Sequence, residues 1–167
     1  MEKHKITLLV MDVDGTLTDG HIYISEEGEV YKVFDVKDGY GISTLLPQYG
    51  IIPVIITGRK SKALQKRCEE LKIYELYQDC SDKFILLKNI ASRYHLEQNK
   101  QRKFNHIAYI GDDLNDLSCI SSCEISACPS DAVDRIKENV QFICSKKGGH
   151  GAVREFIEWL INNFYEK

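Results

Sequence analysis

Two acidic residues follow an apolar stretch near the start of the chain. Residues 6–10 read ITLLV, and Asp12 and Asp14 come shortly after them, just before Gly15. An apolar run that ends in acids predicts a buried parallel strand with carboxylates at its C-terminal edge, where open α/β sheets bind ligands. One carboxylate can then face a substrate as a nucleophile, while the other approaches it where the chain turns at Gly15. The alternative is that the acids only form an Asx-turn or cap a helix.

Three later segments place further polar groups at the ends of predicted elements. Thr57 offers a hydroxyl and a backbone N–H to phosphate oxygens, and Lys83 offers a fixed positive charge. Taken alone, Lys83 would be a solvated charge at the start of a helix, so its interpretation depends on the flanking motifs. The segments are Thr57-Gly58-Arg59 after a second apolar strand, Asp82-Lys83 at the head of a helix, and Gly111 to Asp116 (GDDLND) after another strand.

Strand and helix patterns alternate along the chain, which favours a parallel sheet covered on both faces. The length of 167 residues fits one domain, 1–167. Pro47 is expected to distort or end the first helix early. We predict strands near 6–12, 52–57, 74–78, 106–110, 124–127 and 140–143, and helices over 39–49, 60–71, 82–95, 114–121, 131–137 and 150–164.

One segment departs from this alternation. Residues 21–25 and 30–34 are rich in β-forming residues and are separated by EEGE, which predicts a β-hairpin with Gly28 in its turn. The hairpin follows directly after the first strand. Its outward face is a candidate contact between subunits, and the alternative is a flap that only meets solvent.

Composition excludes several classes of protein. Hydrophobic residues make up 43% and charged residues 28%, with a net charge of −3, so nothing indicates binding to nucleic acid. No apolar stretch approaches the roughly 20 residues that span a bilayer. The six cysteines form no Cys-x-x-Cys pair, and the N-terminus has no signal-peptide pattern. We therefore expect free thiols and a cytoplasmic protein.

The four motifs, in this chain order, resemble those of the haloacid dehalogenase (HAD) superfamily of aspartyl phosphotransferases. The resemblance runs over almost the whole chain. It implies a Rossmann-like three-layer α/β fold with helices on both faces of a parallel sheet and the hairpin at about 21–34 as a flap. Neither residues 34–51 nor residues 58–106 leave room for a cap domain. Enzymes of this kind without a cap often let a neighbouring subunit close the active site.

The resemblance also implies roles for individual residues. Asp12 is the nucleophile and forms an aspartyl-phosphate. Asp14 is the general acid that protonates the leaving alkoxide and then the base that activates water. Thr57 and Lys83 bind the phosphoryl group, and Gly15 allows close approach of the backbone to its oxygens.

A divalent metal ion belongs to the same implied site, and its chemistry suits Mg²⁺, which prefers oxygen ligands. Asp12 binds the metal through its side chain, and Asp14 binds it through its backbone carbonyl. Asp112 completes the metal site, and Asp113 supports it directly or through water. Asp116 either lies in an outer layer around the metal or is an ordinary acid in the first turn of a helix.

Longer strings resemble the 3-deoxy-D-manno-octulosonate (KDO) 8-phosphate phosphatases, a family that implies a homotetramer active in lipopolysaccharide biosynthesis. The guanidinium of Arg59 can pair with a sugar carboxylate. Lys147 and Arg154 flank a glycine-rich entry to a helix, which favours anions; the alternative there is a plain loop. We predict that Gly15, Gly58, Arg59, Lys147 and Arg154 bind the substrate. The strings are DVDGTLTDG (12–20), DGYGI (38–42), TGR (57–59) and KGGHGAVRE (147–155).

The sequence thus predicts a Mg²⁺-dependent phosphatase, a phosphoric monoester hydrolase, for a small 2-keto-3-deoxy sugar acid phosphate, with KDO 8-phosphate first. Two alternatives remain open from related families. One is a phosphatase for nine-carbon sugar acid 9-phosphates, such as those of deaminated neuraminic acid (KDN) or N-acylneuraminate. The other is a non-catalytic oligomerisation domain like those fused to sialic acid cytidylyltransferases, which would lack one of the acids. A HAD phosphatase for nucleotides or phosphoproteins is a further possibility.

Overall fold

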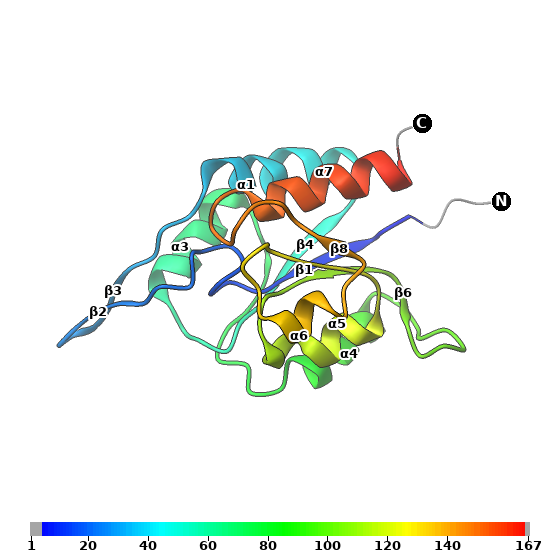
Figure 1. Cartoon of the computed structure of the whole chain (residues 1–167), viewed down its shortest axis with the longest axis horizontal. Coiled ribbons are helices and arrows are strands. Elements are labelled where there is room, and N and C mark those ends of the chain that lie inside the picture. The colour runs from blue at the N-terminus through cyan, green and yellow to red at the C-terminus, as the bar shows by residue number, and fades with distance from the viewer. Residues whose placement is uncertain (1–4, 166–167) are drawn as a thin grey trace.

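Six parallel strands form the central sheet of the computed structural model, which describes residues 5–165 (Figure 1). The strand β1 lies at the centre, since the chain first adds β4 and β5 on one side and then β6, β7 and β8 on the other. Such a reversal opens a crevice at the carboxyl ends of the strands. In sheet order the strands are β5 (Glu75–Tyr77), β4 (Ile52–Ile56), β1 (Leu8–Met11), β6 (Phe104–Ile110), β7 (Cys123–Cys128) and β8 (Phe142–Ile143).

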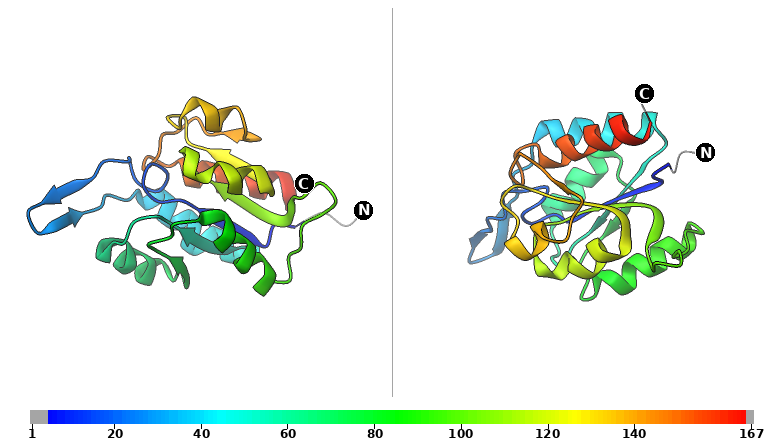
Figure 2. Two further views of the ribbon diagram at one scale, coloured as in Figure 1. Left: turned by 90° about the horizontal axis from the view of Figure 1, so that it is seen from below. Right: turned by 45° about the vertical axis from the view of Figure 1, so that its right-hand side comes forward.

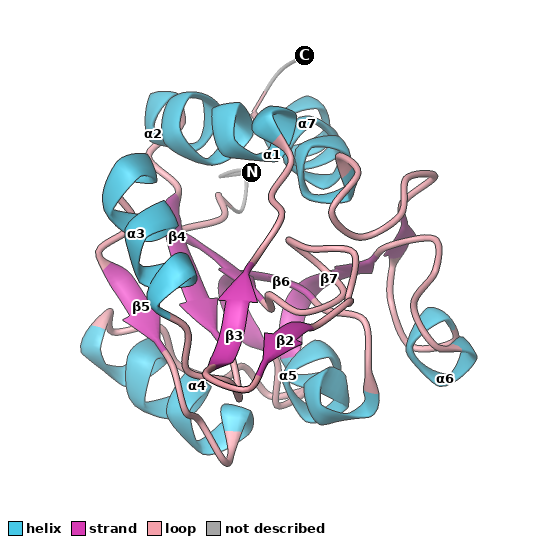
Figure 3. Ribbon diagram, turned by 90° about the vertical axis from the view of Figure 1, so that its left-hand side faces the viewer, coloured by secondary structure: helices cyan, strands magenta, loops and turns pink. Residues whose placement is uncertain are grey.

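Helices cover both faces of this sheet, because side chains along β1 alternate between two cores (Figures 2 and 3). Leu9 and Met11 belong to one core, and Leu8 and Val10 belong to the other. The three-layer α/β fold is therefore confirmed. The first layer contains α1 (Val36–Tyr40), the π-helical η1 (Gly41–Leu45), α2 (Leu46–Gln48), α3 (Lys62–Leu71) and α7 (Ala152–Phe164). The second contains α4 (Lys83–Arg93), the 3₁₀ turn η2 (Leu114–Asp116), α5 (Leu117–Ser122) and α6 (Asp134–Lys137).

The first helix differs from its predicted range of 39–49. It begins at Val36, because the carboxylate of Asp35 accepts a hydrogen bond from the backbone N–H of Lys37 at 2.6 Å and caps the first turn. Pro47 distorts the helix as expected. The turn before it widens, so that the N–H of Leu46 donates to the carbonyl of Gly41, five residues back.

The predicted hairpin is present as β2 (Tyr23–Ser25) and β3 (Gly28–Tyr31), paired antiparallel. It projects away from the central sheet as a separate two-stranded ribbon (Figure 2). The rings of Tyr23 and Tyr31 stack across the two strands, with centroids 4.5 Å apart. The structure therefore has a flap beside β1 and no cap domain among residues 5–165.

Two predictions about the whole chain can also be compared with the structure. Among residues 5–165, no helix has the length and apolar character needed to cross a bilayer. All six cysteines are free thiols, and all except Cys80 are buried.

Candidate active site

The carboxyl ends of β1, β4 and β6 bring the predicted motifs together. Met11 pairs with Ile55 on one side and with Ile110 on the other, so these three strands end at the same level. The residues that follow their ends, Asp12, Thr57 and Asp112, consequently lie along one edge of the sheet. This edge is also the point at which the strand order reverses, the expected place for a ligand.

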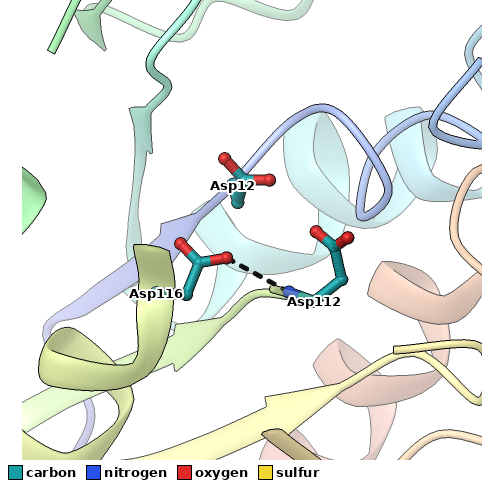
Figure 4. A group of neighbouring side chains, drawn as sticks. All are labelled: Asp12, Asp112 and Asp116. Carbon is teal, nitrogen blue, oxygen red and sulfur yellow. Dashed lines mark hydrogen bonds between the residues drawn. The ribbon is translucent and has the colours of Figure 1, made fainter. Parts of the chain in front are cut away.

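Three carboxylates gather there at the ends of β1 and β6 (Figure 4). One oxygen each from Asp12, Asp112 and Asp116 lies within 4.8 Å of the others. Asp12 is only 5% exposed, and Asp116 is completely buried. Buried acids at this spacing repel one another strongly unless cations accompany them.

Lys83 supplies the first of these cations. It is the first residue of α4, whose N-cap Asp82 accepts a hydrogen bond from the N–H of Ile85 at 2.9 Å. The Nζ of Lys83 donates to Asp12 at 2.5 Å and to Asp116 at 2.7 Å. Burial by itself would lower the pKa of Lys83, but the charges of the two carboxylates raise it above its ordinary value. Lys83 therefore stays protonated next to Asp12.

Asp116 is the centre of the hydrogen bonds around this lysine. Its Oδ1 accepts from Lys83 and, at 2.7 Å, from the hydroxyl of Tyr109. Its Oδ2 accepts from the backbone N–H of Asp112 at 3.2 Å and of Asp113 at 3.5 Å. Because both oxygens are engaged in this way, Asp116 is suited to holding Lys83 and the turn after β6 in place.

The charge of the cluster fits a divalent cation. With Asp12, Asp112 and Asp116 ionised, three negative charges less the single positive charge of Lys83 leave two. Burial, followed by the charge of Asp116, raises the pKa of Asp12 well above its ordinary value and that of Asp112 to about 6. Carboxylate oxygens are the ligands that Mg²⁺ prefers. A divalent cation held by Asp12 and Asp112 would stabilise both ionised forms.

The turn after β1 is fitted closely around Asp112. The hydroxyl of Thr16 donates to Oδ1 of Asp112 at 3.0 Å. Gly15 has φ +99°, and a Cβ at this position would lie 2.1 Å from Oδ2 of Asp112. A side chain at position 15 would therefore displace this carboxylate.

The remaining predicted residues of the core motifs lie around this cluster. Asp14 is half-buried, and its carboxylate accepts a hydrogen bond from Lys32 of the hairpin. Thr57 is buried, and its hydroxyl accepts from the N–H of Arg59 at 3.3 Å, while the residue Arg59 itself is exposed. Asp113 is exposed and accepts from the N–H of Leu114 at 2.7 Å, which places it outside the group of three carboxylates.

The glycine-rich segment near the C-terminus packs against the turn after β1. The N–H of Gly149 donates to the carbonyl of Thr16 at 3.1 Å. A Cβ on Gly148 would lie 1.9 Å from the carbonyl oxygen of Gly15, so only glycine allows this approach. The segment thus supports the backbone that carries Asp14.

The two basic residues of this segment are placed differently. Lys147 is exposed. Arg154 lies in the first turn of α7, where its Nε donates to Glu158 at 2.7 Å and its guanidinium lies 5.2 Å from the ring centroid of Tyr40. The start of α7 is also capped, since Asp38 accepts from the N–H of Arg154 at 2.7 Å. Within residues 5–165, neither basic residue forms a hydrogen bond or an ion pair with Asp12, Asp112 or Asp116.

Sequence reasoning gave too little weight to two residues of this site. For Asp116 the sequence leaves open an ordinary acid in the first turn of a helix, although its place four residues after Asp112 puts both in one turn. Lys32 is not among the predicted site residues, and a lysine within an alternating hairpin is typical of a solvated face. No spacing within the hairpin indicates its contact with Asp14.

Comparisons with known proteins agree with this geometry. The haloacid dehalogenase-like hydrolase family matches residues 72–157. The chain is 38% identical over 156 residues to the 3-deoxy-D-manno-octulosonate 8-phosphate phosphatase KdsC of Salmonella typhi, covering 93% of this chain and 79% of that protein. The chain belongs to the HAD superfamily, in the family of the KDO 8-phosphate phosphatases. It is accordingly a phosphoric monoester hydrolase.

Solved structures of this HAD family share the fold over nearly the whole chain. The KDO 8-phosphate phosphatase of Yersinia pestis has a TM-score of 0.89 at 36% identity, over 98% of this chain and 84% of that one. The enzyme of Moraxella catarrhalis, solved with magnesium, phosphate and KDO, has a TM-score of 0.87 at 38% identity, over 98% and 91%. The HAD fold predicted from the motifs is thereby confirmed.

Gly15→Ala is expected to disable this HAD phosphatase by moving Asp112. Gly50→Ala is the matched control, because Gly50 also has a positive φ, +70°, but has nothing within 4 Å of an added Cβ. Both variants should lose about 1–2 kcal/mol of stability to backbone strain. Only Gly15→Ala should lose activity, by about 10²-fold, the size of effect expected when a group that maintains the geometry of the site is misplaced. Urea unfolding and release of phosphate from p-nitrophenyl phosphate measure the two effects; equal activities would contradict the role of Gly15.

Proposed function

We propose that this chain is a magnesium-dependent phosphatase that hydrolyses KDO 8-phosphate through an aspartyl-phosphate on Asp12. The observation that carries the proposal is the buried carboxylate of Asp12, 2.5 Å from the ammonium group of Lys83 and beside Asp112. The substrate is inferred from the names of the relatives, which are KDO 8-phosphate phosphatases at 38% identity.

In the first step a carboxylate oxygen of Asp12 attacks phosphorus, and the bond between phosphorus and the sugar oxygen breaks. Asp14 gives a proton to that oxygen, which leaves as the alcohol. In the second step water attacks phosphorus, Asp14 takes its proton, and the bond to Asp12 breaks to release inorganic phosphate.

The other residues bind the group that is transferred. The fixed charge of Lys83 and the hydroxyl and backbone of Thr57 hold the phosphoryl oxygens. Magnesium, bound by Asp12, by Asp112 and by the backbone carbonyl of Asp14, with Asp113 in support, offsets the negative charge of the phosphate. The lysine and the metal thus reduce the repulsion between a carboxylate nucleophile and an anionic substrate.

We assign recognition of the sugar acid to Gly58 and Arg59, which follow β4, and to Lys147 and Arg154, which flank the start of α7. A guanidinium pairs bidentately with a carboxylate, and the sugar acid carries one. The exposed position of Arg59 leaves its guanidinium available to a ligand.

We further propose that the chain is a single domain that assembles into a cytoplasmic homotetramer through its hairpin. Apolar side chains of the hairpin and the residues after it face solvent, with Ile24 exposed to 69% and Val30 to 54%. A two-stranded ribbon is marginally stable by itself, so burial of this surface against other subunits would stabilise the flap.

Asp12→Asn is expected to abolish turnover, because an amide is neither a nucleophile nor an anionic metal ligand. Asp134→Asn is the control, since Asp134 is an exposed acid on α6 and is not one of the three clustered carboxylates. Steady-state phosphate release from both folded variants would be measured. Turnover by Asp12→Asn at the rate of the control would overturn the assignment.

A panel of phosphate monoesters tests the substrate. In the presence of magnesium, KDO 8-phosphate should have the highest kcat/KM, above KDN 9-phosphate and nucleoside monophosphates. Preference for the nine-carbon substrate would favour the alternative family.

Removal of the metal is a separate test. A chelator should stop the reaction, and magnesium should restore it better than calcium, which accepts looser coordination. Full activity in excess chelator would refute the proposed metal dependence.

Replacing both Lys147 and Arg154 with alanine should raise KM for sugar acid phosphates, because both cations are assigned to the sugar acid. The KM for p-nitrophenyl phosphate, which lacks the sugar, should stay unchanged. Lys146→Ala is the control, since this neighbouring lysine is also exposed but carries no assigned role. Equal losses on both substrates would mean that the segment supports the fold instead of binding the sugar.

A further inference from the structure

A buried lysine from the hairpin reaches into the active site. Lys32 directly follows β3, and its neighbours Tyr31 and Val33 are each 50% exposed. The side chain of Lys32, in contrast, is only 3% exposed. Its Nζ pairs with Oδ1 of Asp14 and, at 3.2 Å, with Glu29.

The contacts of the hairpin continue from Glu29 to the start of α3. Glu29 accepts a hydrogen bond from the hydroxyl of Ser61. Ser61 is the N-cap of α3, and its hydroxyl oxygen also accepts from the N–H of Leu64 at 3.1 Å. The segment from Thr57 to Arg59 leads directly into this cap. Asp14, the hairpin and the start of α3 are therefore joined by Lys32 and Glu29.

Burial of the ammonium group of Lys32 is unfavourable for folding, so it calls for a role in the site. Moving an ammonium group out of water carries a large desolvation penalty, which carboxylate partners offset only when the geometry is good. A hairpin needs no buried charge for its own stability, and a lysine at this position would ordinarily face solvent. The contact with Asp14 is the feature that distinguishes Lys32 from its exposed neighbours.

We propose that Lys32 is a positioning residue that sets the orientation of Asp14, an inference that rests on the proposed function. Lys32 binds Oδ1 of Asp14, which leaves Oδ2 for the oxygen of the leaving sugar. Because Lys32 is carried by the flap, the flap must be in place before Asp14 is oriented. Glu29 and Ser61 in turn fix Lys32.

The test compares two leaving groups. An alkyl sugar phosphate needs a proton donor for its departing oxygen, whereas p-nitrophenolate leaves without one. The ratio kcat/KM reports only the steps up to release of the leaving group, so the later attack of water does not enter it. Lys32→Met should lower kcat/KM for KDO 8-phosphate on the order of 10²-fold, the size of general acid catalysis. It should leave kcat/KM for p-nitrophenyl phosphate nearly unchanged, and Lys32→Arg should restore most of the loss.

Two controls separate positioning from a purely structural role. Tyr31→Ala removes the ring stack of the hairpin without touching Lys32, and it should change both substrates to the same small extent. In the Asp14→Asn background, Lys32→Gln should cause no further loss on the sugar phosphate, since the two residues act as a unit. This double variant also removes both members of the Lys32–Asp14 pair, so the comparison stands even where Lys32→Met folds poorly.

Equal losses on the two substrates, or fully additive losses in the double variant, would overturn the role of Lys32. The proposed function would be unaffected by either result. A wild-type chain that hydrolyses p-nitrophenyl phosphate but no sugar phosphate would overturn the proposed substrate class and, with it, this role. The two failures are therefore distinguishable.

Discussion

The ammonium group of Lys83 between Asp12 and Asp116 is the interaction on which the rest of the site depends. Three acids converge at the ends of two adjacent strands, and without a central cation their mutual repulsion would oppose folding. Removing one member of such a buried pair typically costs 3–5 kcal/mol. The first turn of α4 is fixed by its Asp82 cap, so the position of this charge is set by a helix and not by a flexible loop. The ion pairs of Lys83 with Asp12 and Asp116 therefore stabilise the fold and also hold the groups of the proposed chemistry in place.

The arrangement also explains the different burial of the acids. Asp116 gives both oxygens to hydrogen bonds with the protein and is completely buried. Asp112 and Asp14 lie nearer the surface, and Asp14 is held from the side of the hairpin. Asp116 and Asp12 are therefore the more buried acids, and Asp112 and Asp14 are the more accessible ones. In the proposed mechanism, Asp116 keeps Lys83 in place, while the more accessible position of Asp14 suits contact with the leaving group.

The parallel sheet, the meeting of the motifs at its edge and the hairpin were predictable from the sequence. Apolar runs define the strands, and parallel strands bring their carboxyl ends to one edge, so motifs far apart in the chain had to meet. The hairpin followed from Gly28 and its flanking β-forming residues. The contact of Lys32 with Asp14 and the hydrogen bonds of Asp116 with Lys83 and Tyr109 were not predictable, because they depend on side-chain distances across elements. The same holds for the approach of Gly148 to Gly15, which no local pattern encodes.

That close approach has a consequence for how the protein is made. The turn that follows β1 rests on the backbone of Gly148 and Gly149, which are synthesised more than a hundred residues after it. Domains are synthesised at about 5–20 residues per second. For several seconds during synthesis the turn after β1 therefore exists without its contacts to Gly148 and Gly149. The backbone contacts that support this turn can therefore form only after residues 148 and 149 have been added to the chain.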